Sequence, residues 1–521
     1  MATERRNKVL LGTSSSYAGV LITNLLAVVT VPVTLNYFGA DRYGALALVM
    51  TLVNYLSVTN FGIPTACAVL AAKSVDRREQ LAIICRSFLL IAGISMVVLA
   101  LFLTIAGYPG WVAVLGKIPD GISGEVRQAA FWTAVLFLLN LLTAPFQAGF
   151  IAVQKVHVER FYMTLAANSY VVALAGTIIW KGDLADFALA RGALVLLCGL
   201  AGACHFLFGC RENRAILGGG WLSLLRTPSS QESAVRSILA SGARMFVVGL
   251  ASLVVWQTDN LVISHFYGVG AVTPYQITFK LITMLFIIFT AVNPAISPHY
   301  GRAWAVGDTA WINGTYNQIA RVSSVLGGLV WIGSLAFAET VVDIWTGPAS
   351  FGGGVVVFSL GGYGYLLSLV SVHAALLSSL NLVRNLPRIS WLEAGVNLPL
   401  SLLLVRSLGI GGVALGTFAA SLTTVFWLIP REIDRGTEGT VRFDWRPLLK
   451  EFFMVVAPAV AVVLVANRFI PAGMPRLLVN ALVVALYLLA SYLRLPASIR
   501  VMVGELTAKP LALLSRKGAR R

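Results

Sequence analysis

Long apolar runs separated by short polar segments constrain this chain more than any other feature. Fourteen such runs can be recognised, and most approach the ~20 residues that a helix needs to cross a bilayer. Only 12% of the 521 residues are charged, against roughly 25% in soluble domains. The sequence therefore predicts an all-α polytopic membrane protein with about 14 transmembrane helices. The runs lie approximately at 10–36, 44–71, 81–106, 129–153, 162–180, 187–209, 239–264, 274–298, 319–342, 354–378, 389–405, 412–430, 452–470 and 476–493.

Lysine and arginine are distributed unevenly between the two sides of these runs. The net charge is +17, which in a soluble chain would suggest nucleic-acid binding, but the positive residues cluster between apolar runs. With the N-terminus inside, 30 fall on the cytoplasmic side and eight on the other, while Lys280 lies within a run. The positive-inside rule then predicts that both termini are cytoplasmic. The eight on the other side are Arg42, Lys117, Arg127, Lys181, Arg191, Arg406, Arg468 and Arg476.

The polar segment 210–238 separates the first six runs from the next six, and two further runs follow these. We expect an N-terminal lobe at 1–209, this cytoplasmic linker, and a C-terminal lobe at 239–430, followed by a loop with two further spans at 431–494. The basic tail at 495–521 has the pattern of a helix on the anionic inner leaflet, although a solvated tail is the alternative.

A weak internal repeat supports two related halves. LNYFGADRYG at 35–44 resembles ISHFYGVGAVTPY at 263–275, an offset of about 230 residues. Duplicated halves with a central binding site are a common plan for transporters. In the first copy, the adjacent Asp41 and Arg42 suggest a surface ion pair in an external turn.

Two charges lie inside apolar runs on either side of one predicted turn. Asp259 precedes the turn and Lys280 follows it, so both are expected ~8–9 Å inside the same face of the membrane. Ionisable groups at that depth cost several kcal/mol unless they face a wet cavity or each other. Both alternatives stay open: the residues line a cavity, or they form an ion pair.

Further polar residues within the runs are candidates for substrate or ion binding. Arg244 enters the seventh run from the cytoplasmic side, where snorkelling to the interface is the alternative. Glu393 and His373 are candidate proton-responsive groups, with ordinary interface chemistry as the alternative. Amide side chains suit sugar recognition, although interhelical hydrogen bonding is common for such residues. They are Asn24, Asn54, Asn60, Asn140, Gln147, Asn168, Gln257 and Asn293.

Several kinds of chemistry have no matching pattern in this sequence. The glycine clusters at 218–221 and 351–354 lack the GK[ST] of a phosphate-binding loop. The five cysteines have neither metal-ligand spacing nor the look of a disulfide framework. We therefore expect no catalytic residues, no metal and no cofactor, with an H+ or Na+ gradient as the driving force.

The motifs around the two repeat copies resemble a known family. Near the N-terminus the chain reads Pro-x-x-Leu-x-x-Phe-Gly-x-x-x-Tyr-Gly from Pro32 and then Asn-Phe-Gly-Ile-Pro at 60–64. The central hairpin reads Asp-Asn-Leu-Val-Ile-Ser at 259–264, Tyr-Gln-Ile-Thr-Phe-Lys at 275–280 and Pro-x-x-Ser-Pro at 294–298. With fourteen spans, this resembles the polysaccharide transporters of the multidrug/oligosaccharidyl-lipid/polysaccharide (MOP) superfamily, and most closely the Wzx-type O-antigen and exopolysaccharide repeat-unit flippases.

The resemblance implies a fold, a substrate and a location. The fold would be two pseudo-symmetric six-helix bundles around a central cavity, as in MATE proteins, plus two C-terminal helices. The substrate would be an undecaprenyl-pyrophosphate-linked oligosaccharide moved from the cytoplasmic to the periplasmic leaflet of a bacterial inner membrane. Partners would be the lipid bilayer, a polysaccharide polymerase and a chain-length regulator, and no nucleic acid.

Each candidate residue then receives an expected role. Lys280, Arg244, Asn54, Asn60, Asn140 and Gln257 are expected to bind substrate, and Asp259, Glu393 and His373 to gate or couple ions. A MATE-like drug/cation antiporter is an alternative that would want an acidic cavity, and the intramembrane charge here is at best balanced. A membrane polysaccharide polymerase or ligase is another, but its external loops would need a catalytic platform, and those of this chain are short.

Overall fold

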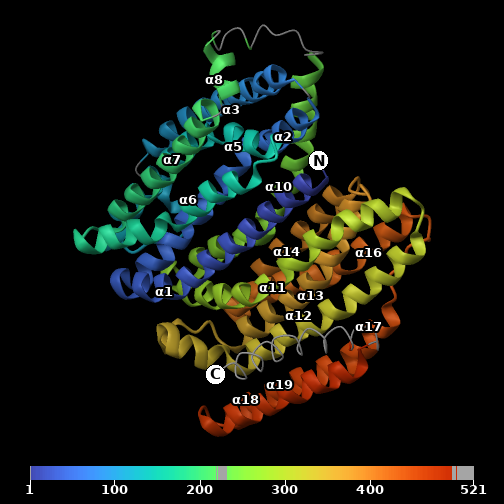
Figure 1. Ribbon diagram of the computed structural model, residues 1–521. Helices are drawn as coiled ribbons and strands as arrows, with labels where there is room; N and C mark the ends of the chain where they lie inside the picture. The colour runs from blue at the N-terminus through green and yellow to red at the C-terminus, as the bar shows by residue number, and fades with distance from the viewer. Residues whose placement is uncertain are drawn as a thin grey trace, which may run out of the picture. The chain divides into compact units, whose positions relative to one another are not determined.

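A computed structural model gives the structure of the chain (Figure 1). It describes residues 2–495 apart from 75, 109, 210, 219, 221–223 and 225–231, and also residue 500. The side chains at 2–14, 16, 211, 217, 232–245 and 287–295 lie outside the description.

Every regular element in the described residues is helical, which confirms the predicted all-α class. Short 3-10 turns and one π-helical turn connect or interrupt the α-helices: η1 Val58–Asn60, η2 Trp111–Leu115, η3 Val269–Ala271, η4 Pro348–Ser350 and η5 Phe452–Val456. The α-helices are α1 Ala2–Ser57, α2 Ile63–Lys73, α3 Arg77–Ala106, α4 Asp120–Leu141, α5 Ala144–Ala152, α6 Val156–Ile179, α7 Leu184–Phe208, α8 Arg211–Gly218, α10 Glu232–Tyr267, α11 Val272–Ala305, α12 Thr309–Thr346, α13 Gly354–Ser379, α14 Leu386–Leu408, α15 Ile410–Thr423, α16 Val425–Gly436, α17 Trp445–Glu451, α18 Ala457–Phe469 and α19 Met474–Arg494.

Ten helical segments among the described residues are long and apolar enough to cross a membrane, or up to eleven if the bent pair α4 and α5 forms one span. The segment Tyr17–Asn60 counts once, yet its 44 residues are about twice the ~20 of a single crossing. Its backbone leaves helical geometry at Gly39, which separates the first two predicted spans. The chain is therefore a multi-pass membrane protein.

The two copies of the internal repeat share a backbone conformation at their turns. Gly39 has φ 78° and ψ 173°, and Gly268 has φ 85° and ψ 169°. Side chains other than glycine rarely adopt this region, so both turns depend on their glycine. The turns also touch, because the Thr273 hydroxyl donates a hydrogen bond to the Ala40 carbonyl at 2.6 Å.

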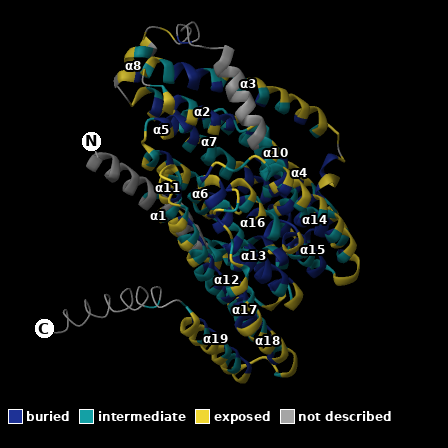
Figure 2. Cartoon of the chain, turned by 90° about the vertical axis from the view of Figure 1, so that its right-hand side faces the viewer, coloured by how far each residue is buried: buried dark blue, intermediate teal, exposed yellow. Residues whose placement is uncertain are grey.

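Helix α19 shows how the bilayer determines which residues are buried. Asn480 and Tyr487 are buried: Asn480 donates to the Ala336 carbonyl at 3.0 Å and Tyr487 to the Val325 carbonyl at 2.7 Å, both on α12. Its leucines at 478, 482, 486, 489 and 493 are more than half exposed, along the yellow surface in Figure 2. A polar inner face and an apolar outer face are the reverse of a soluble helix, as expected where lipid is the solvent.

The chain divides into two compact units. The first comprises Met1–Ile277, Ile344–Gly352 and Leu386–Thr417, and the second comprises Thr278–Asp343, Gly353–Asn385 and Phe418–Arg521. Within the first unit α4 packs along α7, α6 packs against α7 and α1, and α10 packs along α14 (Figure 1). The lobe boundaries at 1–209, 210–238, 239–430, 431–494 and 495–521 stay a prediction, as does a central cavity.

Candidate functional site

The carboxylate of Asp259 lies in a closed hydrogen-bonded cluster within the first unit. The side chain is 6% exposed on α10, and it accepts a hydrogen bond from the Tyr275 hydroxyl at 2.5 Å. The Thr417 hydroxyl of α15 lies 3.2 and 3.3 Å from the two carboxylate oxygens. Asn397 of α14 in turn donates to the Thr417 hydroxyl at 2.9 Å, and its own buried Oδ1 has no partner. Hydroxyls of α11 and α15 therefore surround the buried carboxylate of α10, and α14 reaches it only through Thr417.

Two side chains that were predicted to bind sugar are hydrogen-bonded to each other. The side-chain amide of Asn54 on α1 donates a hydrogen bond to the side-chain Oε1 of Gln257 on α10 at 3.0 Å. One turn further along α10, Asn260 donates to the Thr51 hydroxyl at 2.9 Å and accepts from Gln276 of α11. This ladder joins α1, α10 and α11 through amides, the interhelical bonding that membrane helices commonly use. A role for Asn54 and Gln257 in binding substrate stays a prediction.

A cavity of about 470 Å³ lies inside the first unit, between α1, α4, α5, α6 and α7. Two of the predicted ligands, Asn60 and Asn140, line it together with Gln147. Asn60 also fixes its own turn, because its Oδ1 accepts the Gly62 amide hydrogen at 2.7 Å. No aspartate or glutamate is among the lining residues described for this cavity.

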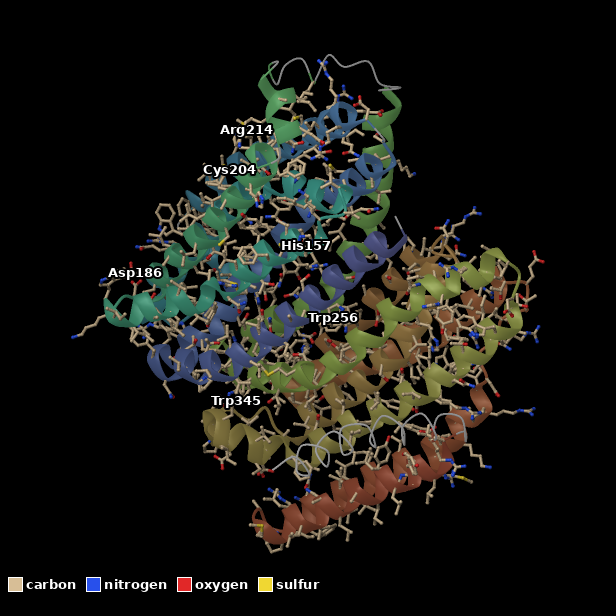
Figure 3. The ribbon with its side chains drawn as sticks, viewed as in Figure 1. His157, Asp186, Cys204, Arg214, Trp256 and Trp345 are labelled. Carbon is tan, nitrogen blue, oxygen red and sulfur yellow. The ribbon has the colours of Figure 1, made fainter. Side chains whose placement is uncertain are left out.

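Arg191 supplies the one charge among those lining residues. It lies on α7, which begins at a capping box formed by Asp183 and Asp186 (Asp186 is labelled in Figure 3). Its guanidinium carbon lies 5.2 Å from the centre of the Tyr170 ring. Its Nη1 donates a hydrogen bond to the Met50 thioether sulfur at 2.6 Å. Its buried Nε has no hydrogen-bond partner. Arg191 lies within the predicted apolar run 187–209, and its expected position on the side opposite the cytoplasm stays a prediction.

The remaining predicted residues lie in different places. Lys280 is half-buried on α11 and belongs to the second unit, where its ammonium has no described partner within that unit. Its pairing with Asp259 of the first unit stays a prediction. Arg244 is on α10, but its side chain lies outside the described residues. Glu393 is half-buried on α14 in the first unit.

His373 lies fully buried on α13 in the second unit. Its Nδ1 is 2.7 Å from the Tyr316 hydroxyl, and its ring meets Phe443 edge-on at 4.7 Å. Its Nε2 is buried without a partner. The surroundings are aromatic, so the geometry is that of a packed core histidine, and a role in ion coupling stays a prediction.

Two other predicted amides of the first unit bond locally. Asn24 donates to the Val20 carbonyl at 2.8 Å and Asn168 to the Thr164 carbonyl at 2.9 Å, one turn back on their own helices. Asn293 lies outside the described side chains.

Sequence reasoning missed four residues of these clusters. Arg191 falls inside the apolar run 187–209, and a charge inside an apolar run was the signal that could have made it a candidate. Tyr275, Thr417 and Asn397 are ordinary polar residues in apolar surroundings, and only their approach to Asp259 and to each other distinguishes them.

Solved structures of other membrane proteins have the same fold. The chain is similar to a structure of the lipid II flippase MurJ in an inward closed conformation, with a TM-score of 0.66 and 12% identity over 92% of this chain and 98% of that one. An inward-facing MATE multidrug resistance transporter of the MOP superfamily gives a TM-score of 0.63 and 14% identity over 82% of this chain and 95% of that one. This likeness confirms the predicted MOP-type fold.

Proteins related in sequence include one that is named as an O-antigen transporter. The chain is 22% identical to the Salmonella typhimurium protein named "Putative O-antigen transporter", over 80% of this chain and 94% of that protein. It is also 22% identical to the membrane protein EpsK of Bacillus subtilis, over 64% of this chain and 65% of that protein. A family model described as "Polysaccharide biosynthesis protein" matches residues 9–304, more than half of the chain. The chain belongs to this family.

Proposed function

We propose that this protein is a flippase that moves undecaprenyl-pyrophosphate-linked oligosaccharide repeat units from the cytoplasmic to the periplasmic leaflet of a bacterial inner membrane. It works by alternating access in surface polysaccharide biosynthesis. The family, the MOP-type fold and the O-antigen transporter name of a relative support transport over catalysis. A polymerase and a chain-length regulator would receive the delivered unit.

The observation that carries the proposal is the lining of the cavity in the first unit. Amides and hydroxyls provide hydrogen-bond donors and acceptors for sugar hydroxyls, and Arg191 provides positive charge. A lipid-linked oligosaccharide has an anionic, hydroxyl-rich head that cannot cross hydrocarbon unaided. The lining carries no described carboxylate, so it suits this head better than a cationic drug, which argues against the drug/cation antiporter.

The segment after α3 argues against a polymerase or ligase. The turn around η2 is fastened to the end of α10 by main-chain bonds: the Lys117 amide donates to the Ser264 carbonyl at 3.1 Å, and the Val269 amide to the Lys117 carbonyl at 3.1 Å. A loop held flat against the helix ends offers little room for the catalytic platform that such an enzyme needs.

Lys280 and Asp259 carry the remaining roles in this proposal. A lysine ammonium is a point charge that binds diphosphate and releases it more readily than a bidentate arginine fork. Asp259, Thr417 and Asn397 present oxygen atoms, the ligands that a proton or Na+ would use. A cation that binds the Asp259 carboxylate would break the hydrogen bond that the Thr417 hydroxyl donates to it. The packing of α15 on α10 would change as a result.

The proposal is tested in a strain that lacks this gene, fed a radiolabelled sugar of its own repeat unit. We expect labelled lipid-linked units to accumulate in the inner leaflet, and the wild-type chain to move them outward. Lys280→Ala should reach the membrane in normal amount but restore no surface polysaccharide, while Lys280→Arg should restore part of it. Accumulation in the outer leaflet would contradict a flippase and indicate a polymerase.

A further inference from the structure

The cavity in the first unit is elongated and its two ends differ in chemistry. On α7 it is lined from Ala188 past Arg191 to Gly199. Eight residues separate Arg191 from Gly199, which is ~12 Å along a helix. A Cβ on Gly199 would lie 2.3 Å from the Asn140 Oδ1, so the amides of α4 and α5 face the end away from Arg191. Its volume of about 470 Å³ falls within the ~300–1,000 Å³ typical of small-ligand sites.

Two side chains that line the cavity each carry a buried polar atom with no hydrogen-bond partner among the described residues. The side chains are Arg191 and Thr133, and the atoms are the Arg191 Nε and the Thr133 Oγ1. Thr133 is only 7% exposed. Buried donors of this kind are usually paired, because an unpaired one costs ~1–3 kcal/mol.

The neighbours of Arg191 stabilise its charge only weakly. A thioether is a weak acceptor, and the Tyr170 ring offers its π face without a carboxylate. Elsewhere in the same unit Arg42 is matched by the bidentate carboxylate of Glu125. A guanidinium presents a planar fork of donors that fits a carboxylate or phosphate. The missing partner of Arg191 therefore has the chemistry of an oxyanion.

The amide end adds donors and acceptors suited to hydroxyl groups. The Gln147 amide of α5 donates a weak hydrogen bond to the Thr143 hydroxyl at 3.4 Å. Asn140 lies on α4, one turn before Thr143. A ligand that fills both ends needs an anionic group and, several ångströms away, groups that both donate and accept hydrogen bonds.

We propose that this cavity binds an acidic sugar unit. Its carboxylate or phosphate accepts hydrogen bonds from Arg191 and Thr133, and its hydroxyls meet Asn140 and Gln147. The assignment deepens the proposed function and rests on it, because the acidic sugar is taken to be part of the transported glycan. The site lies within one bundle, so it selects the glycan independently of Lys280 on the second unit.

The test uses the full chain purified into lipid nanodiscs, with radiolabelled glucuronate as the probe. We expect saturable binding that unlabelled glucose displaces at least tenfold less well than unlabelled glucuronate. Arg191→Gln should weaken glucuronate binding at least tenfold, and Thr133→Val severalfold. The matched control is Arg127→Gln, an exposed arginine of α4, which should bind as the wild type does. Unchanged binding in Arg191→Gln, or equal displacement by glucose and glucuronate, would overturn the proposal.

Two further arms identify the source of the oxyanion and guard against misfolding. Inorganic pyrophosphate stands in for the lipid diphosphate; if it displaces the probe at lower concentration than glucuronate does, the site belongs to the carrier lipid and the sugar assignment fails. Asn140→Ala should weaken glucuronate binding but leave pyrophosphate competition unchanged, and equal losses of both would contradict the two-ended site. If Arg191→Gln does not fold, Arg191→Lys keeps the charge without the fork and should still lose severalfold in affinity.

The outcome can be separated from that of the proposed function. If glucuronate binding depends on Arg191 but the protein moves no lipid-linked unit, the binding site is supported and the flippase function is contradicted. Outward movement of repeat units by a chain whose glucuronate binding ignores Arg191 would remove only the site.

Discussion

Asp259 and Arg191 are two charges inside the same unit, and the protein surrounds them in opposite ways. The Asp259 carboxylate accepts hydrogen bonds from hydroxyls of α11 and α15. The Arg191 guanidinium faces a cavity with one buried nitrogen unsatisfied and no carboxylate beside it. The comparison indicates that Asp259 is part of the packing of its helices. Arg191 has a free donor, and a bound ligand could provide the acceptor for it. Substitutions should therefore affect stability at Asp259 and binding at Arg191.

The largest expected effect is on stability at Asp259. Asp259→Leu removes the acceptor of two buried hydroxyls, each of which would cost ~1–3 kcal/mol when left unpaired. We expect the free energy of unfolding to fall by about 2–5 kcal/mol, seen as a lower melting temperature of the purified protein in detergent. Asp259→Asn keeps one acceptor oxygen and should lose much less. A melting temperature in Asp259→Leu equal to that of the wild type would mean that the cluster does not hold its helices together.

Arg191 should show the opposite pattern. Arg191→Gln removes a cation that has no carboxylate among its described neighbours, so the free energy of unfolding should stay within about 1 kcal/mol of the wild-type value or rise, because the thioether of Met50 is only a weak acceptor and loses little. Transport of an acidic repeat unit should fall roughly 10-fold or more, since hydrogen bonds to charged groups contribute ~1.5–3 kcal/mol. Surface polysaccharide and melting temperature are measured on the same variant. A large loss of stability with normal transport would reverse the comparison and make Arg191 a structural residue.

The amide ladder next to Asp259 should contribute less than either charge. A double-mutant cycle of Asn54→Ala and Gln257→Ala isolates their hydrogen bond, and interhelical bonds in membranes average ~0.6 kcal/mol. We expect a coupling of this size from melting temperatures or denaturant titration of the four proteins. A coupling above ~2 kcal/mol would show that this hydrogen bond holds α1 on α10 far more strongly than an ordinary interhelical bond does.

These contrasts also explain what the sequence could and could not reveal. The apolar runs report burial in lipid directly, so the helices were predictable from them, whereas the MOP-type fold was predicted only through the resemblance of motifs to a known family. The repeat located both glycine turns at Gly39 and Gly268. Which side of a helix a polar residue occupies depends on neighbours distant in the chain. Asp259 was recognised by its charge, but Thr417 lies 158 positions away and carries no signal of its own. Arg191 was counted only for the side of the membrane on which it lies, and its approach to Met50 and Tyr170 joins residues that are distant in the chain.

Arg42 gives the smallest expected effect and sets the baseline for a charge that is paired at the bundle surface. Its predicted partner was the adjacent Asp41, but the structure pairs it with Glu125 of α4 through two bonds of 2.7 and 2.8 Å. Residues adjacent on a helix point in different directions, so a neighbour in sequence is a poor partner. Both side chains are partly exposed, 37% and 21%, so Arg42→Gln should cost no more than ~0.5 kcal/mol, in the lower part of the range for exposed pairs. The loss should shrink when salt is raised from 0.1 to 1 M, because salt screens exposed pairs. A loss that persists at high salt would mean that the pair is desolvated in the membrane and resembles the Asp259 cluster.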